Sequence, residues 1–326
     1  MSAAVRTRAY RDGAVLAEGF PVVEVSEYLA DPRVVVWVDF CAPVEADLVE
    51  LADELGLHDL AVEDALSPHQ RPKVDYYDTH LFLSSHVMRL DPGTGVLGTT
   101  EIDAFVNSRW LVTVRKDDSF ALDPVLQRWD RSVQLIVHGG GFLLYGLLDV
   151  IIDSYFELIS QFDDYYDTVS EALFSDTPLK PSGQQMWFEM RRSLVRFHRL
   201  VVPMREAISG LMRREHHAVD EAIYPYFQDV YDHVLRVTES TDALRDLVST
   251  IVETNLSLRD YRQNQVMKMV TSWAAIIALP TLITGFYGMN VPFPGNGRPF
   301  GVVMAVGLIV VLSVALYLVF RQRKWL

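Results

Sequence analysis

The sequence has 326 residues, half of them hydrophobic, and a formal charge of −14 at neutral pH. A chain of this length can bury one large core or two smaller ones. Its acidic balance argues against nucleic acid as a partner, because phosphate binding needs a basic face. The single cysteine, Cys41, excludes disulfides within the chain and thiolate metal clusters, and it is typical of a reducing compartment.

Residues 1–140 are predicted to form a cytoplasmic α/β domain. Four segments rich in β-branched and aromatic residues are expected as strands, at 33–40, 80–90, 100–116 and 132–141. Residues 44–57 have the apolar spacing of a helix with a negatively charged first turn. The first 20 residues contain charges and no apolar signal segment, so we expect this domain to stay in the cytoplasm.

From residue 141 onward the apolar spacing becomes helical. Residues 141–221 are predicted to form a cytoplasmic helical hairpin, broken at 175–183 and bent at Pro203. A stalk helix is expected at 222–268, continuing into an apolar segment at 269–287. If that helix runs unbroken from Ile223 to Tyr287 it is about 100 Å long, which no compact domain requires.

Two C-terminal segments are uncharged and long. Residues 269–297 contain no charged side chain, and neither do residues 300–320. A helix needs roughly 20 residues to cross about 30 Å of hydrocarbon, so we predict membrane spans at 269–287 and 300–320. A pair of buried core helices is the alternative. Arg262 and Lys268 precede the first span and the basic tail 321–326 follows the second, which places both outer ends in the cytoplasm.

Charge is distributed very unevenly along the chain. The last 66 residues carry six basic and no acidic residues, so the first 260 carry a net charge of −20. Such a domain repels itself unless cations screen it, above all when several copies assemble.

One face of the first span is small or polar at heptad spacing. Steps of three and four from Asn264 reach Met267, Thr271, Ala274, Ala278, Thr281, Gly285 and Gly288. We refer to this row as the stripe. Its continuation backward includes Asp260 and Glu253, which suits either a vestibule for cations or a solvated helix face. The small residues fit either the lining of a pore or a tightly packed helix pair.

The ligands available along these spans are limited. Neither span contains an acid or a base, so a proton relay has no obvious carrier. Hydroxyls, one amide and backbone carbonyls remain, and such oxygen ligands suit a hard cation such as Mg²⁺. They would not hold zinc or copper tightly.

Residues 287–290, "YGMN", lie at the outer end of the first of two C-terminal spans and resemble the signature of the CorA family of magnesium transporters. Further segments are similar to the bacterial members: 63–82, 143–156, 225–249, 264–270 and the closing "KWL". The resemblance covers roughly residues 60–326. It implies a homopentamer with a cytoplasmic α/β funnel, a long pore helix and an outer ring of second spans.

The resemblance also implies roles for individual residues. Gly288, Met289 and Asn290 would form the selectivity filter in the extracytoplasmic loop 288–299. Asn264, Met267, Thr281 and Gly285 would line the pore, in agreement with the stripe, and Val270 beside it is a candidate hydrophobic gate. A regulatory Mg²⁺ site would use Asp229 and His233, with Asp91 of the adjacent subunit as partner. The outer loop departs from the family pattern because it has no acidic residue and contains Arg298.

Two other histidine motifs are given structural interpretations. The run from His138 to Gly141 lacks the Gly-x-Ser-x-Gly elbow of a hydrolase. The adjacent His216 and His217 are interpreted as a solvated helix end, since neighbouring helical residues point in different directions.

We therefore expect a two-span protein of the cell membrane that is a channel rather than an enzyme. Its partners would be further copies of itself, membrane lipid and divalent cations. Mg²⁺ is expected as transported and regulatory ion, with Co²⁺ or Ni²⁺ as further candidates. A carrier for zinc or another divalent cation, with or without proton coupling, is the alternative. A membrane-tethered sensor that does not transport is a third hypothesis.

Overall fold

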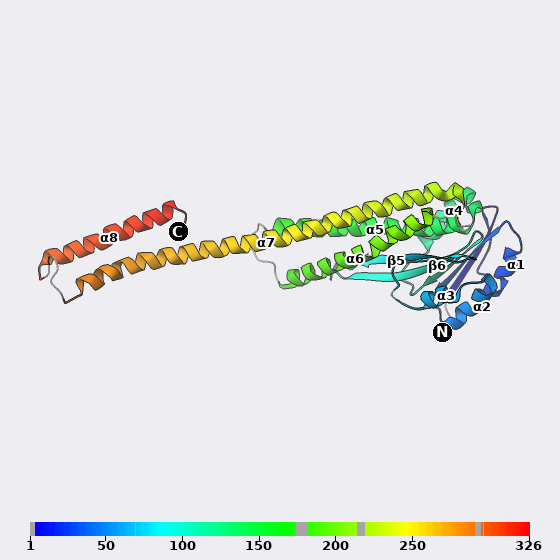
Figure 1. Ribbon diagram of the computed structural model, residues 1–326, viewed down its shortest axis with the longest axis horizontal. Coiled ribbons are helices and arrows are strands. Elements are labelled where there is room, and N and C mark those ends of the chain that lie inside the picture. The colour runs from blue at the N-terminus through cyan, green and yellow to red at the C-terminus, as the bar shows by residue number, and fades with distance from the viewer. Residues whose placement is uncertain (1–3, 69, 174–180, 214–218, 291–294, 296) are drawn as a thin grey trace. The chain divides into compact units, whose positions relative to one another are not determined.

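The computed structural model describes residues 4–68, 70–173, 181–213, 219–290, 295 and 297–326, and it divides into two compact units, Met1–Val248 and Ser249–Leu326. The first unit contains one sheet with helices packed on it (Figure 1). The second contains the end of a long helix and one further helix. The predicted fold class, an α/β domain followed by a long helix and a C-terminal apolar helix, is confirmed.

Seven strands form the sheet, in the order β2-β1-β3-β7-β6-β5-β4. β3 and β7 run parallel, and the other neighbouring pairs are antiparallel. The strands are β1 (Ala4–Arg11), β2 (Ala14–Glu18), β3 (Val34–Cys41), β4 (Lys73–Tyr76), β5 (Leu81–Leu90), β6 (Leu97–Val106) and β7 (Trp110–Arg115).

The helices account for the remainder of the fold. They are η1 (Val22–Glu24), α1 (Val25–Leu29), α2 (Glu45–Leu55), α3 (Asp59–Leu66), α4 (Asp123–Arg131), η2 (Val133–His138), α5 (Gly140–Ala172), α6 (Pro181–Arg213), η3 (Glu221–Ile223), α7 (Tyr224–Tyr287) and α8 (Pro299–Gln322). Pro203 lies inside α6, and its bend stays a prediction. Most of the predicted break between the hairpin helices, and both His216 and His217, lie outside the described residues.

The sheet buries both of its faces, as the alternation along β3 shows. Every second residue of β3, namely Val34, Val36, Val38 and Phe40, lies in one hydrophobic core. The same core contains residues of α1, α2 and α3. Trp37 points to the opposite face, where its ring centroid lies 5.2 Å from that of Trp129 in α4. Strands buried on both faces are nearly continuous hydrophobic runs, which explains why residues 34–38 were recognisable as a strand.

Two of the expected strands differ from the structure. Residues 100–116 form parts of two strands, β6 and β7, joined by a tight turn in which the Asn107 amide donates to the Trp110 carbonyl at 3.0 Å. The strand expected at 132–141 is wrong, because residues 133–138 form the short helix η2 and α5 begins at Gly140. Gly139 there has a φ of +76°. A Cβ on Gly140 would lie 2.2 Å from the Asn107 carbonyl oxygen, so the close approach of the start of α5 to the β6–β7 turn requires glycine.

The second unit has large hydrophobic side chains on its surface. Along α8 these include Phe300, Val303 and Val311, each more than 60% exposed. The C-terminal part of α7 is long and apolar enough to cross a membrane, and so is the whole of α8. Exposed apolar surface on this scale is costly in water, whereas hydrocarbon removes the cost.

A polar cluster is buried at the β6–β7 side of the sheet. The Lys116 ammonium lies 3.1 Å from an Asp103 carboxylate oxygen and 3.2 Å from one of Glu101. One ammonium therefore faces two buried carboxylates. Burial raises the pKa of Asp103 to about 7, with Lys116 opposing the rise and Glu101 adding to it.

The raised pKa of Asp103 predicts a pH-dependent stability. The folded protein holds this proton more tightly than the unfolded chain, so the contribution of Asp103 is complete below about pH 4 and is lost as the pH rises to about 7. Asp103→Asn, which stays neutral, should not share that loss. We expect its thermal denaturation midpoint to exceed that of the unmodified protein by about 2–4 °C at pH 8 and to approach it at pH 5.

The control for this prediction is Asp118→Asn, which removes the same charge from an exposed position. It should leave the pH profile of the midpoint unchanged. An Asp103→Asn protein that is less stable than the unmodified protein at pH 8 would contradict the prediction.

Candidate metal cluster and candidate pore face

Three side chains from two helices form a candidate metal cluster in the first unit. One ligand atom each from Asp149, Asp229 and His233 lies within 4.8 Å of the others. Asp149 belongs to α5, whereas Asp229 and His233 are four residues apart on α7 and therefore share a face. Asp149 is 1% exposed, within a part of α5 that is otherwise apolar. The packing of α7 against α5 thus brings together residues 80 positions apart.

Two further charged residues adjoin the cluster. Asp153, one turn beyond Asp149 on α5, lies 3.6 Å from Nδ1 of His233 and 3.7 Å from Nη1 of Arg128. Arg128, on α4, also forms an ion pair with Asp149. The second ring nitrogen of His233, Nε2, lies 3.8 Å from an Asp229 oxygen.

The electrostatics of the cluster favour a bound cation. Three carboxylates face one guanidinium, so the group has a formal charge of −2 when His233 is neutral. Burial raises the pKa of Asp149, Arg128 opposes that rise and Asp153 reinforces it. Oδ2 of Asp149 is paired with the Arg128 guanidinium, whereas the buried Nδ1 of His233 has no hydrogen-bond partner among the described residues. Carboxylate oxygens suit Mg²⁺, and an added imidazole nitrogen suits Co²⁺, Ni²⁺ or Zn²⁺.

Asp91 does not belong to the cluster within one chain. It follows β5, where its carboxylate accepts hydrogen bonds of 2.8 Å from the Gly93 amide and the Thr94 hydroxyl. These bonds lower its pKa. Its predicted role as the partner on an adjacent subunit therefore stays a prediction. Asp149 and Asp153, which the sequence analysis missed, are the α5 carboxylates that the fold brings to Asp229 and His233.

The stripe lies on an exposed face of α7 in the second unit. All of its members are exposed, and so is the adjacent Val270; the members are Asn264, Met267, Thr271, Ala274, Ala278, Thr281, Gly285 and Gly288. A different face of the same helix is buried at Ser272 and Ile283. Ala278, Thr281, Gly285 and Met289 line a shallow groove on the exposed side. Further back, the predicted vestibule residues Glu253 and Asp260 are exposed as well.

The Gly-Met-Asn sequence follows directly on the end of α7. The Gly288 amide donates to the Thr284 carbonyl at 2.9 Å, and the Met289 amide donates to the Phe286 carbonyl at 3.3 Å. These bonds satisfy carbonyl groups that the helix end would leave without partners. Asn290 follows and is exposed, so its amide is available to a ligand. Residues 291–294 of the loop lie outside the described part of the chain.

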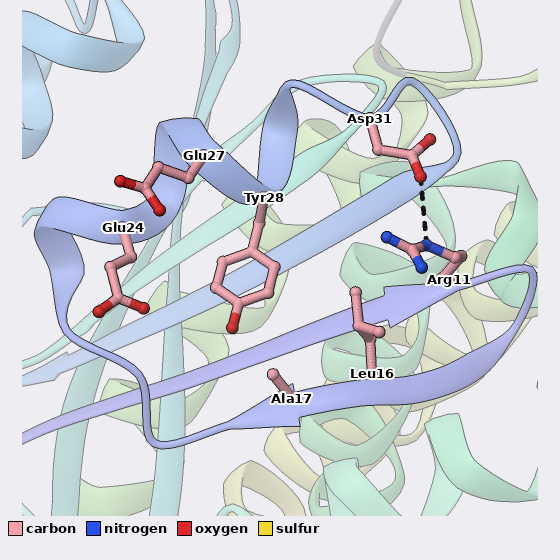
Figure 2. Close-up of a pocket in the computed structure, with 7 residues that line it drawn as sticks. All are labelled: Arg11, Leu16, Ala17, Glu24, Glu27, Tyr28 and Asp31. Carbon is pink, nitrogen blue, oxygen red and sulfur yellow. Dashed lines mark ion pairs between the residues drawn. The ribbon is translucent and has the colours of Figure 1, made fainter.

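Two other polar sites carry no comparable chemistry. Figure 2 shows a pocket beside β2 and α1 in which Asp31 turns toward Arg11, 3.2 Å away, while Glu24 and Glu27 do not converge with it. The carboxylates of this pocket therefore do not form one ligand set. His138 pairs with Asp220 at 2.7 Å, and this contact connects the end of η2 to the start of η3. This contact supports the structural interpretation of the His138 motif.

Comparison with known proteins identifies relatives over nearly the whole chain. The family model described as "CorA-like Mg2+ transporter protein" matches residues 33–322. The cobalt/magnesium transport protein CorA of Thermotoga maritima is 29% identical over 91% of this chain and 85% of its own length. The putative metal ion transporter YfjQ of Bacillus subtilis is 29% identical over 89% of each chain.

Solved structures show the same fold. The complete CorA magnesium transporter of Methanocaldococcus jannaschii superposes with a TM-score of 0.77 at 20% identity, covering all of both chains. The full-length CmaX protein superposes with a TM-score of 0.71 at 21% identity, covering 99% of this chain and 98% of its own.

Proposed function

The chain belongs to the CorA-like Mg²⁺ transporter family, and from this premise we propose that it is a channel for potential-driven Mg²⁺ uptake. The observation that carries the proposal is the stripe, an exposed row of small and polar residues on an apolar helix that ends at Gly-Met-Asn. A single copy leaves this row facing hydrocarbon, where polar groups are costly. Several copies with their stripes toward a common axis would enclose an aqueous path instead, and we propose a homopentamer.

The proposed path selects ions by oxygen ligands rather than by charge. The described parts of the two spans contain no acidic or basic side chain, so the ion meets hydroxyls, carbonyls and a ring of Asn290 amides. Mg²⁺ loses its water reluctantly, and such a ring can hold it through its hydration shell. With both termini in the cytoplasm, an inside-negative potential supplies about 2.3 kcal/mol per charge per 100 mV, and roughly twice that for a divalent ion.

We also propose that cytoplasmic Mg²⁺ regulates this channel at the cluster. Asp229 and His233 stand on the same helix as the stripe, so metal bound there acts on the element that lines the proposed pore. Bound metal would neutralise repulsion among cytoplasmic domains that carry −20 each and stabilise a closed state. A bound ion shifts the balance between the closed and the open state only if it binds one of them more tightly. Asp91 of the adjacent subunit is the proposed additional ligand.

Substituting Asn290 tests transport directly. In liposomes holding the purified protein, a magnesium-sensitive dye should report uptake under an imposed inside-negative potential. Asn290→Ala should reduce the rate at least about tenfold, the effect of losing about 1.4 kcal/mol of stabilisation of the passing ion. Asn255→Ala, a change of the same kind off the stripe, should conduct normally.

Parallel measurements separate the other hypotheses. A zinc dye, used with and without a pH gradient, distinguishes a zinc or proton-coupled carrier from a magnesium channel. Uptake by the unmodified protein no faster than by empty liposomes would exclude transport and leave the tethered sensor.

Blocking the stripe is a second test. Ala278→Trp places an indole in the groove beside Thr281, and a ring of such side chains should close a narrow path. We expect uptake to fall to near the rate of empty liposomes. Val310→Trp, on an exposed face of α8, is the control and should retain most of the activity. Equal rates for both variants would show that the stripe does not line the path.

The regulatory site is tested by charge reversal. Asp229→Lys should weaken inhibition by Mg²⁺ on the cytoplasmic side by about tenfold or more, because an ammonium replaces a metal ligand. Asp232→Lys makes the same change one turn away, where Asp232 is exposed and accepts a bond from Gln228. It should leave inhibition nearly unchanged. Undiminished inhibition of the Asp229→Lys channel would rule out the assignment.

A further inference from the structure

Arg128 holds the carboxylates that a metal ion in the cluster would use. Its guanidinium forms an ion pair with Asp149 and lies 3.7 Å from Asp153. Asp149 is also one of the three residues whose ligand atoms converge within 4.8 Å. A divalent ion and the guanidinium would therefore compete for the same buried charge.

The burial of Asp149 explains why a permanent cation is needed there. A carboxylate that is 1% exposed is costly to ionise without a partner. When no metal is bound, Arg128 supplies the compensating charge, and it cannot lose its proton in the physiological range. When metal arrives, the two cations repel each other at close range.

The surroundings of Arg128 provide a place for the displaced guanidinium. Asp149, Asp153 and Glu157 succeed one another at intervals of four on α5, so they lie along one face of the helix. Arg128, Asp153 and Glu157 line one surface pocket. The Arg128 side chain is 35% exposed and therefore not locked in the core. It can move from Asp149 toward the more exposed acidic residues without losing all its partners.

We propose that Arg128 is a tethered counter-ion of the regulatory site, bound to Asp149 in the metal-free state and displaced when a divalent cation binds. The proposal rests on the regulatory metal site proposed above. Its consequence is a lower affinity for the metal, because part of the binding free energy is spent on breaking the Arg128 ion pair. Arg128 would thereby set the Mg²⁺ concentration at which the site fills.

The test compares two arginines of the same helix. Arg128→Gln removes the counter-ion, whereas Arg131→Gln removes the same charge from a side chain to which the structure gives no ion pair among the described residues. Calorimetric titration of the purified full-length protein with Mg²⁺ measures the binding component that Asp229→Lys abolishes. We expect at least fivefold tighter binding in Arg128→Gln and no change in Arg131→Gln.

A second readout uses stability rather than affinity. Without metal, Arg128→Gln leaves Asp149 buried without its counter-charge, so its denaturation midpoint should fall below that of the unmodified protein. Saturating Mg²⁺ should then raise the midpoint by more than it does in the unmodified protein. If Arg128→Gln does not fold, Arg128→Lys keeps the charge but not the paired donors, and it should bind Mg²⁺ at least twofold tighter.

Several outcomes would overturn the proposal. Weaker binding in the folded Arg128→Gln or Arg128→Lys protein would mean that the arginine supports the site, and equal binding would mean that it does not compete. Absence of any Asp229-dependent Mg²⁺ binding in the unmodified protein would remove both the counter-ion and the regulatory site. Normal uptake in liposomes would in that case leave the proposed transport intact.

Discussion

A charge in hydrocarbon is costly, and α7 has to satisfy that constraint while it also carries residues suited to cations. The helix places Asp229 and His233 in its first turns and its acidic residues before Arg262, and from Met269 to its end at Tyr287 it has no charged side chain. Within that apolar part, the stripe is an exposed row of small and hydroxyl residues, and the hydroxyls of Ser272 and Thr284, which lie off the stripe, donate to carbonyls of their own helix. The N-terminal part of α7 is thus charged and its C-terminal part is uncharged. We therefore assign the proposed regulation to the first part and the proposed conduction to the second.

The buried charges of the first unit are compensated in three different ways. Asp39 is matched by Arg115, whose Nη2 donates at 2.8 Å, and the Thr113 hydroxyl adds a further bond. Asp103 and Glu101 share Lys116, and burial raises the pKa of Asp103 to about 7, so a proton compensates the excess charge. At Asp149 the excess negative charge lies next to the exposed Asp229. An ion from solvent can reach that cluster, which is why the cluster rather than the sheet interior suits a metal.

The sequence allowed prediction of features that depend on local pattern. The uncharged spans, the long helix and the strand at 34–38 are each visible in a short window of residues. Residues 133–138 were mistaken for a strand because β-branched residues are common in strands, whereas the structure of this segment depends on the contact of Gly140 with the β6–β7 turn. Asp149 was missed for a similar reason. Its partners include Asp229 and His233 of α7, 80 or more residues away in the chain, although one acid in an otherwise apolar stretch of α5 was a usable signal.

The proposed regulatory site on the proposed pore helix would not by itself explain gating, because a ligand changes an equilibrium only by its difference in affinity between two states. The cluster offers a physical source for that difference. Its ligands come from two helices, α5 and α7, and its charge is shared with Arg128 on a third, α4. Any rearrangement that separates α7 from α5 therefore disperses the metal ligands while Arg128 can remain with Asp149 and Asp153. The metal would favour the arrangement in which α5 and α7 are together, and the arginine would be compatible with both arrangements. In the proposed mechanism, competition between the two cations would then couple the Mg²⁺ concentration to the position of α7.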